Sequence, residues 1–268
     1  MTIGWFSTGR DEAARQLLQV VYQKILEGDI KGKIAFTFSN REPGEDRESD
    51  LFFDLVRSYN IPLVCFSSQK FKESYGLATA TDSEKLLRWR LEYDRQVMKR
   101  LEGLQPDLCV LAGYMLIVGE EMCRRYNMIN LHPAVPGGPK GTWQDVIWTL
   151  IENKAVESGI MMHLVTPELD SGPVITYCTY PIRGKPFDTY WREVDGLSVP
   201  EIKKKQGEEN PLFQLIRHHG LAREFPLIVS TLKAFSNCDI RIEARKLLDR
   251  AGKPISGYNL SREVDRAI

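Results

Sequence analysis

The sequence has no excess of either charge and no long hydrophobic run. Its 268 residues include 36 Lys and Arg and 36 Asp and Glu, so the formal net charge is zero. A neutral chain gives no electrostatic reason to expect nucleic acid or an anionic membrane as a partner. No segment approaches the ~18 consecutive apolar residues of a membrane-spanning helix, and Met1 to Phe6 lacks the basic flank of a signal peptide. We therefore expect a cytoplasmic protein that acts on a small molecule.

Cysteine is scarce and carries no pattern. The five cysteines are an odd number, they are widely spaced, and none forms a Cys-x-x-Cys pair. Neither a disulfide framework nor a thiolate zinc site is indicated. Apolar residues make up 43% of the chain and charged residues 27%, which is typical of an ordinary globular protein. The length suits one large domain, or one domain with a C-terminal appendage.

Short apolar runs alternate with amphipathic stretches along the first half of the chain. We predict strands at 3–6, 34–38, 63–66, 108–112 and 128–131, and helices at 11–26, 50–59 and 84–101. Farther on, 143–153 and 211–235 are predicted helices, and 159–165 and 174–180 are predicted strands. Strands that alternate with helices through short links imply crossover connections. The fold class is therefore α/β, a doubly wound and mostly parallel sheet covered on both faces.

The second half of the chain changes composition. Residues 187–210 turn polar, with three consecutive lysines at 203–205, and we interpret them as an exposed, partly helical insertion. The predicted organisation is an α/β domain over 1–186, this polar insertion over 187–210, and a C-terminal helix and extension over 211–268 that packs on the same domain.

Polar or glycine-containing segments follow the predicted strands where each one ends. They are Ser7-Thr8-Gly9-Arg10, Ser39-Asn40-Arg41, Gly113-Tyr114-Met115 and His132-Pro133. The binding crevice of a doubly wound sheet lies outside the C-terminal ends of its strands, so we expect these segments to converge on one site. The turn-forming stretch Pro133 to Gly141 is expected to line the entrance.

The run Asn130-Leu131-His132-Pro133, followed by His163 and then by Asp170-Ser171-Gly172, is the strongest chemical signal. An amide donates to an oxyanion, an imidazole carries a proton, and a carboxylate orients the imidazole. Each residue alone has an ordinary structural explanation, because Asn and Asp are common in turns and a lone His is more often structural. The set together predicts an active site.

Three segments carry a resemblance to a known family. Pro106 to Met115, Ile129 to Pro133 and His163 to Ile175 resemble the folate-dependent formyltransferases, within a similarity that runs from about Ile3 to Arg183. Asn-x-His-Pro paired at this distance with His-x6-Asp-x-Gly is specific as a combination. The layout is most similar to members that formylate phosphoribosylglycinamide in purine biosynthesis. The resemblance implies a Rossmann-type fold and metal-free transfer of a formyl group from 10-formyltetrahydrofolate, the co-substrate, to a primary amine.

The same resemblance implies roles for individual residues. Asn130, His132 and Asp170 would be catalytic, with His163 supporting them from the adjoining strand on the acceptor side. The folate would be bordered by two segments, which contribute Tyr114, Met115, Leu116, Val165, Glu168 and Leu169. The amine acceptor would meet the loop after the first strand, Thr8-Gly9-Arg10. Phosphate-binding members of the family carry a Gly-rich, Ser/Asn-bearing turn there, whereas this chain has Asp11 and Glu12, which repel a phosphate. Arg10 is the group that can compensate.

Several alternatives stay open at the level of sequence. The acceptor can be another amine, such as an amino sugar nucleotide or an aminoacyl-tRNA, although the tRNA enzymes normally need a C-terminal barrel. The chain can instead be a formyltetrahydrofolate hydrolase, a metal-dependent hydrolase that uses His132, His163 and Asp170 as ligands, or a folate-binding protein without activity. Small-molecule partners and a homodimer are the expected assembly.

Overall fold

The computed structural model describes residues 1–76 and 83–268, and a mixed eight-stranded sheet organises them. The strand order is β10-β7-β6-β5-β4-β1-β2-β3. The bounds are β1 Thr2–Phe6, β2 Lys33–Ser39, β3 Leu63–Cys65, β4 Leu108–Leu111, β5 Met128–His132, β6 Glu157–Leu164, β7 Val174–Pro181 and β10 Tyr258–Asn259. Neighbouring strands are parallel except at β5–β6 and β6–β7. The predicted α/β class and mostly parallel sheet are confirmed.

The chain order reverses between β1 and β4, which lie next to each other in the middle of the sheet. From β1 the chain moves outward through β2 to β3, then crosses back to β4 and continues through β5 to β7. Such a switch point leaves a crevice outside the C-terminal ends of the two strands, because their connections leave in opposite directions. The loops after β1 and β4 begin there.

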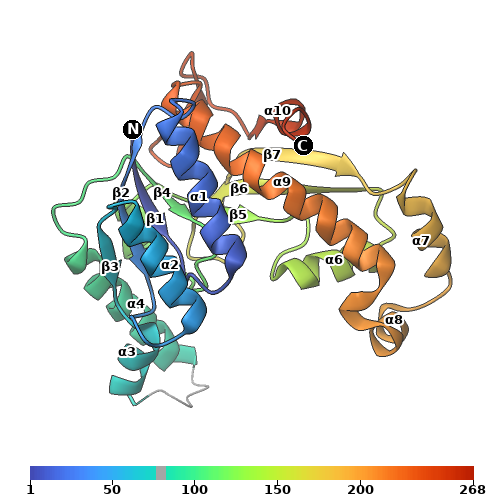
Figure 1. Cartoon of the computed structure of the whole chain (residues 1–268), viewed down its shortest axis with the longest axis horizontal. Helices are drawn as coiled ribbons and strands as arrows, with labels where there is room; N and C mark the ends of the chain where they lie inside the picture. The colour runs from blue at the N-terminus through green and yellow to red at the C-terminus, as the bar shows by residue number, and fades with distance from the viewer. Residues whose placement is uncertain (77–82) are drawn as a thin grey trace.

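Helices cover both faces of the sheet. The larger ones are α1 Glu12–Leu26, α2 Arg47–Ser58, α4 Ser83–Arg100, α6 Trp143–Glu152 and α9 Pro211–Ser236, and the shorter ones are α3 Ser68–Ser74, α5 Glu120–Arg125, α7 Phe187–Glu193, α8 Val199–Lys205 and α10 Ser261–Asp265. Figure 1 shows α2, α1 and α9 side by side across one face. No helix in the described part of the chain is long and apolar enough to cross a membrane.

The alternation of side chains along β1 explains why both faces are covered. Ile3 and Trp5 join a core cluster with α1, α2 and α9, whereas Phe6 joins the opposite cluster with α4 and α5. Successive side chains of a strand point to opposite faces, so a strand that is apolar at every position must be buried on both. Burial on both faces explains why these strands appear in the sequence as short apolar runs.

Apart from a few buried side chains, most of residues 187–210 are exposed. They form α7 and α8, and Phe187, Trp191 and Ile202 are buried in a third core cluster with α6 and the first turns of α9. Three large apolar side chains among many charges are enough to dock two short helices. The C-terminal extension adds a hairpin of β8 Ile240–Glu243 and β9 Lys246–Asp249, which the sequence analysis did not resolve.

Candidate active site

Strand β5 carries Asn130 and His132 to the edge of the sheet. Asn130 is opposite His163 in the antiparallel pairing with β6, and it adjoins Leu111 of β4 on its other side. The register of β6 against β7 shifts at Met162 and His163. An irregularity of this kind re-aims a side chain next to a functional site. The pairing therefore brings the amide and the second imidazole together, although 33 residues separate them.

A tight turn after β6 carries Asp170 to the same place. Asp170 has φ +47°, a left-handed conformation that Asp and Asn tolerate better than most residues. At Gly172 an added Cβ would lie 1.6 Å from the carbonyl oxygen of Leu164. Only glycine fits there, so the chain can fold directly back over the end of β6. This close approach sets the position of the carboxylate.

The four polar side chains meet in a small, water-poor cluster. Nδ1 of His132 lies 3.6 Å from Oδ2 of Asp170, and Nε2 of His163 lies 3.4 Å from Oδ1. The Nδ2 atom of Asn130 is 3.2 Å from Nε2 of His163. Both imidazoles are 3% exposed and the carboxylate is 6% exposed. The predicted convergence of these residues is present, and the low exposure means that the charge interactions are weakly screened.

Burial and charge act in opposite directions on His132. Removal from water lowers its pKa below the usual 6.5, and this effect exceeds the opposing influence of the Pro139 carbonyl and of Asp170. Asp170 behaves in the complementary way. Burial raises the pKa of its carboxyl group, but the contacts with His163 and His132 outweigh that effect and leave the pKa below its usual value. The resting site is thus a carboxylate beside a neutral His132.

The Pro133–Gly141 loop covers this cluster rather than only lining an entrance. The Nε2–H of His132 donates to the carbonyl oxygen of Pro139 at 2.9 Å, and the N–H of Gly141 donates to Oδ2 of Asp170 at 3.2 Å. Lys140 also reaches Ser171 at 2.7 Å. These backbone contacts were missed by sequence reasoning, because a turn-rich loop does not indicate where its carbonyls and amides point.

The loops after β1, β2 and β4 converge as predicted. The hydroxyl of Thr8 donates to Oδ1 of Asn40 at 2.7 Å and accepts from the N–H of Met115 at 3.0 Å. Thr8 is therefore a structural tie within the crevice. Gly9 has φ +66° and its N–H donates to the Ser7 hydroxyl, so the backbone N–H of Gly9 is already paired within the chain.

Arg10 and Asp11 lie at the mouth of the crevice. Arg10 is exposed and its Nε lies 3.3 Å from Oδ2 of Asp11. The other oxygen of Asp11 accepts from the N–H of Ala14 and caps α1. A helix N-terminus attracts anions, and here the carboxylate of Asp11 accepts one of the free N–H groups of α1.

The residues expected to border the folate fall into two groups. Met115 and Leu169 are about half exposed, and Glu168, next to Leu169 in the sequence, is exposed. Leu116 is partly buried. Tyr114 packs edge-on against Phe6 and its side chain is buried.

Val165 is buried and fully hydrogen-bonded. Its N–H donates to Met128, and its carbonyl accepts from Nη2 of Arg245 at 2.8 Å. Arg245 comes from the β8–β9 hairpin and was missed. Little in the sequence indicates this hairpin turn. Ala244 and Arg245 take the left-handed conformation of a two-residue turn, but the glycine or asparagine usual in such turns is missing. Val165 thus anchors the start of the Asp170 turn to the core and to the β8–β9 hairpin.

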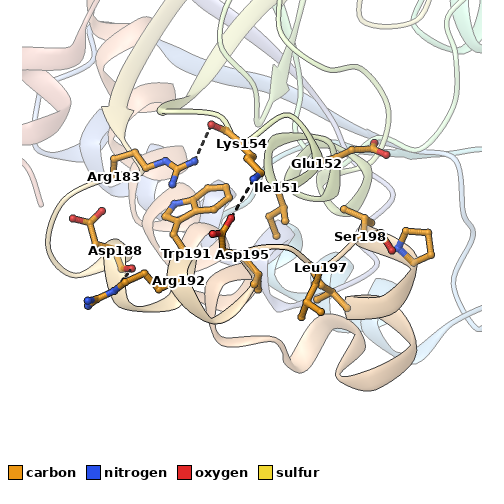
Figure 2. A pocket seen from close by; sticks show the side chains of 14 residues that line it. Ile151, Glu152, Lys154, Arg183, Asp188, Trp191, Arg192, Asp195, Leu197 and Ser198 are labelled. Carbon is orange, nitrogen blue, oxygen red and sulfur yellow. Dashed lines mark hydrogen bonds and ion pairs between the residues drawn. The ribbon is translucent and has the colours of Figure 1, made fainter.

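Among the described residues, no group of His, Cys, Asp and Glu is arranged to hold a metal ion. A cavity of about 660 Å³ lies elsewhere, between the end of α6 and the helices α7 and α8. Figure 2 shows that its charged rim pairs internally, with Lys154 against Asp195 at 3.1 Å and Arg183 donating to the carbonyl of Lys154. None of the four clustered polar residues lines it.

Comparisons with known proteins agree with this geometry. A family model described as formyl transferase matches residues 12–188. The phosphoribosylglycinamide formyltransferase of Escherichia coli is 29% identical over 167 residues, which are 62% of this chain and 68% of that protein. The enzyme of the same name from Haemophilus influenzae is 26% identical over 246 residues, 90% of this chain and 92% of its own length. A solved structure of the Coxiella burnetii phosphoribosylglycinamide formyltransferase shares the fold, with a TM-score of 0.67, 20% identity and coverage of 97% of this chain and 98% of that one.

Proposed function

The chain belongs to the formyl transferase family, and from that premise we propose that it transfers a formyl group from 10-formyltetrahydrofolate to a primary amine, with phosphoribosylglycinamide as the acceptor. The observation that carries the proposal is the meeting of Asn130, His132, His163 and Asp170 in one buried cluster at the C-terminal edge of the sheet. Such a cluster suits a reaction that creates and then discharges an oxyanion.

The first step is attack by the amine. Its lone pair forms a bond to the formyl carbon, and the π electrons of the carbonyl move onto oxygen. The amide of Asn130, held by His163, and the Nε2–H of His132 donate to that oxyanion. Because His132 now gives its Nε2–H to the carbonyl of Pro139, the formyl oxygen replaces that carbonyl as the acceptor. The Pro133–Gly141 loop must therefore shift when the substrates bind.

The second step moves one proton. The attacking nitrogen loses a proton and the folate nitrogen N10 gains one as the bond between carbon and N10 breaks. His132 is neutral before attack, and its Nδ1 faces Asp170. We assign Nδ1 as the temporary proton acceptor, reached through a water that Asp170 holds, because the imidazolium then lies between the oxyanion and the carboxylate. The proton then passes from Nδ1 to N10, and tetrahydrofolate leaves.

The two half-exposed apolar side chains define the donor position. Met115 follows β4, and its N–H is bonded to Thr8 of the loop after β1, whereas Leu169 directly precedes Asp170. Large apolar side chains exposed in a crevice gain from being covered. We place the folate there, with Leu116 and Glu168 at its border and with Tyr114 and Val165 as support from the core.

The acceptor position lies at the loop after β1. Asp11 excludes a phosphate from the N-terminus of α1, so we assign the phosphate of the acceptor to Arg10, whose guanidinium is exposed. We further propose that the protein acts in the cytoplasm, alone or as a homodimer. Its partners are small molecules and not nucleic acid, in line with a net charge of zero.

A direct assay tests the proposal. Purified protein is mixed with 10-formyltetrahydrofolate and phosphoribosylglycinamide, and the release of tetrahydrofolate is followed with and without the acceptor, before and after dialysis against a chelator. We expect release that depends on the acceptor and survives the chelator. Release without an amine indicates a hydrolase, loss with the chelator indicates a metal enzyme, and release with a different amine corrects the acceptor. The variant His132→Ala serves as the inactive control.

A further inference from the structure

The buried carboxyl group of Asp94 has no place in the reaction described above. It lies on α4, and the residue is 3% exposed in the core beneath the loop that follows β4. Its Oδ2 accepts the backbone N–H of Gly119 at 2.5 Å. An acidic side chain is almost never buried without a partner that requires it. The partner here is the backbone of a neighbouring loop.

Gly119 explains how close this contact is. It is the residue before the first turn of α5, a position where a side chain usually caps the helix, and glycine has none. A Cβ added to Gly119 would lie 2.9 Å from Oδ2 of Asp94. The carboxylate thus enters space that only glycine leaves open. An acid from another helix fixes the end of the 114–119 loop.

The same loop is fixed at its other end by a second buried polar group. The N–H of Met115 donates to the hydroxyl of Thr8 at 3.0 Å. Between the two anchors, Met115 is half exposed at the crevice and Leu116 is partly exposed. The loop therefore displays its apolar side chains from a short span whose backbone is tied at both ends.

We propose that Asp94 is a positioning residue for the folate donor, acting through Gly119 on the loop that carries Met115 and Leu116. The inference rests on the proposed function, because it places the donor against that loop. Asp94 itself touches no substrate. Its removal changes how tightly the folate is held and leaves the chemistry at His132 intact, which distinguishes it from the members of the buried cluster.

The charge state of Asp94 gives the proposal a measurable signature. Burial raises the pKa of Asp94 from its usual range to about 7, against the opposing effect of the Gly119 N–H. The charged groups around it are Arg90 on its own helix and Glu121 on α5. The phenol groups of Tyr93 and Tyr114 and the thiol of Cys123 on α5 lie nearby. As the pH rises through neutrality the carboxyl ionises, and a charge-assisted hydrogen bond to Gly119 is stronger than a neutral one.

Linkage then couples the proton on Asp94 to the folate. If the ionised form fixes the loop, tetrahydrofolate binds better at higher pH, and its binding in turn favours ionisation of Asp94. Since a charged hydrogen bond is about twice as strong as a neutral one, we expect binding to be roughly three- to fivefold tighter at pH 8 than at pH 6. Binding near pH 7 should release part of a proton.

The experiment is calorimetric titration of the full-length protein with tetrahydrofolate at pH 6, 7 and 8. At pH 7 it is repeated in two buffers of different ionisation enthalpy, which gives the number of protons released. The test variant is Asp94→Asn, whose amide oxygen still accepts from Gly119 but does not titrate. The matched control is Asp107→Asn. The carboxylate of Asp107 also accepts a backbone N–H, that of Thr2 at 2.6 Å, but it lies at the N-terminal ends of β1 and β4, away from the proposed site.

We expect Asp94→Asn to abolish the pH dependence of binding and the proton release, and to keep kcat at saturating donor within about twofold of the unchanged protein. Asp107→Asn should behave like the unchanged protein. The inference is overturned if Asp94→Asn keeps the full pH dependence and proton release. It is also overturned if Asp107→Asn loses them. If the unchanged protein does not bind tetrahydrofolate, the proposed function itself fails. That result differs from one in which the unchanged protein binds with the expected pH dependence and Asp94→Asn keeps that dependence.

Discussion

Asp170→Asn is the substitution that probes the buried cluster most selectively. Asparagine has nearly the same shape as aspartate and also tolerates the left-handed conformation at φ +47°. Its amide oxygen can still accept the N–H of Gly141. The variant therefore removes one negative charge while preserving the turn, and we expect its melting temperature to stay within about 4 °C of the unchanged protein.

The magnitude follows from the distance between the two groups. An imidazolium at His132 and a carboxylate 3.6 Å away attract by about 4–5 kcal/mol at an effective dielectric constant near 20. Water and the amide dipole replace part of this attraction in the variant. Since each 1.4 kcal/mol corresponds to a factor of ten, the loss in kcat is about 10²- to 10³-fold. The Michaelis constants should change little, because the charge on His132 exists only after attack begins.

The pH profile gives the sign of the effect. Activity needs a neutral His132 before attack, so kcat/KM falls as the pH drops through the pKa of His132, which burial places below 6.5. Asp170 raises the pKa of His132. In Asp170→Asn the fall of kcat/KM in acid therefore moves to lower pH, and the maximal rate at higher pH decreases. Steady-state rates of tetrahydrofolate release between pH 5 and 8.5 measure both changes. A variant with a normal plateau, or an acid limb that moves to higher pH, refutes the assigned role.

Three further outcomes are expected. Gly172→Ala places a methyl group 1.6 Å from the carbonyl of Leu164, so it should lower the free energy of unfolding by about 2–4 kcal/mol in urea titrations and abolish turnover; a stable, active variant contradicts the geometry of the turn. Asp11→Asn keeps the cap of α1 and removes a charge beside the acceptor, so the KM for phosphoribosylglycinamide should fall severalfold, and an unchanged KM places the phosphate elsewhere. Arg10→Ala should raise the same KM; if it does not, Arg10 is not the phosphate ligand.

The folded protein is also expected to lose stability in acid in two stages. The pKa of His132 is lower when folded than its ordinary value of 6.5, so its contribution is complete above pH 6.5 and declines as the pH falls below it. The pKa of Asp170 is also lowered, and its contribution is lost only below about pH 4. Urea unfolding at pH 7 and 5.5 measures the first window, and urea unfolding at pH 4 and about pH 2.5 measures the second. Asp170→Asn should lack the second, and a variant that keeps it refutes this account.

The sheet and its central helices were predictable because their residues repeat a simple pattern. Ile3-Gly4-Trp5-Phe6 is a short run without a polar residue, which is typical of a strand buried on both faces. Leu17, Leu18 and Val21 recur at helical spacing and pack in the same core. Asp11 was predicted to begin the first helix, and it caps that helix. Local pattern and tertiary packing agree in these elements, so the sequence is informative about them.

The rest of the site depends on backbone atoms that a sequence does not display. The carbonyl of Pro139 and the N–H of Gly141 contact the side chains of His132 and Asp170, yet nothing in a turn-forming loop indicates the direction of these backbone groups. The bordering role predicted for Tyr114 and Val165 came from their position in a matching segment. The side chains of both residues lie in the core cluster that includes α4 and α5. The burial of Phe187, Trp191 and Ile202 depends in the same way on tertiary packing, which the polar composition of residues 187–210 does not display.

The most direct test of the central claim follows the transferred carbon itself. 10-Formyltetrahydrofolate labelled with ¹³C in its formyl group is incubated with the protein and phosphoribosylglycinamide, and the label is observed by NMR. We expect the ¹³C signal to appear in a formamide on the acceptor, in step with the release of tetrahydrofolate, and to stay on the donor with His132→Ala. Label that accumulates as free formate, or that stays on the donor with the unchanged protein, contradicts the account.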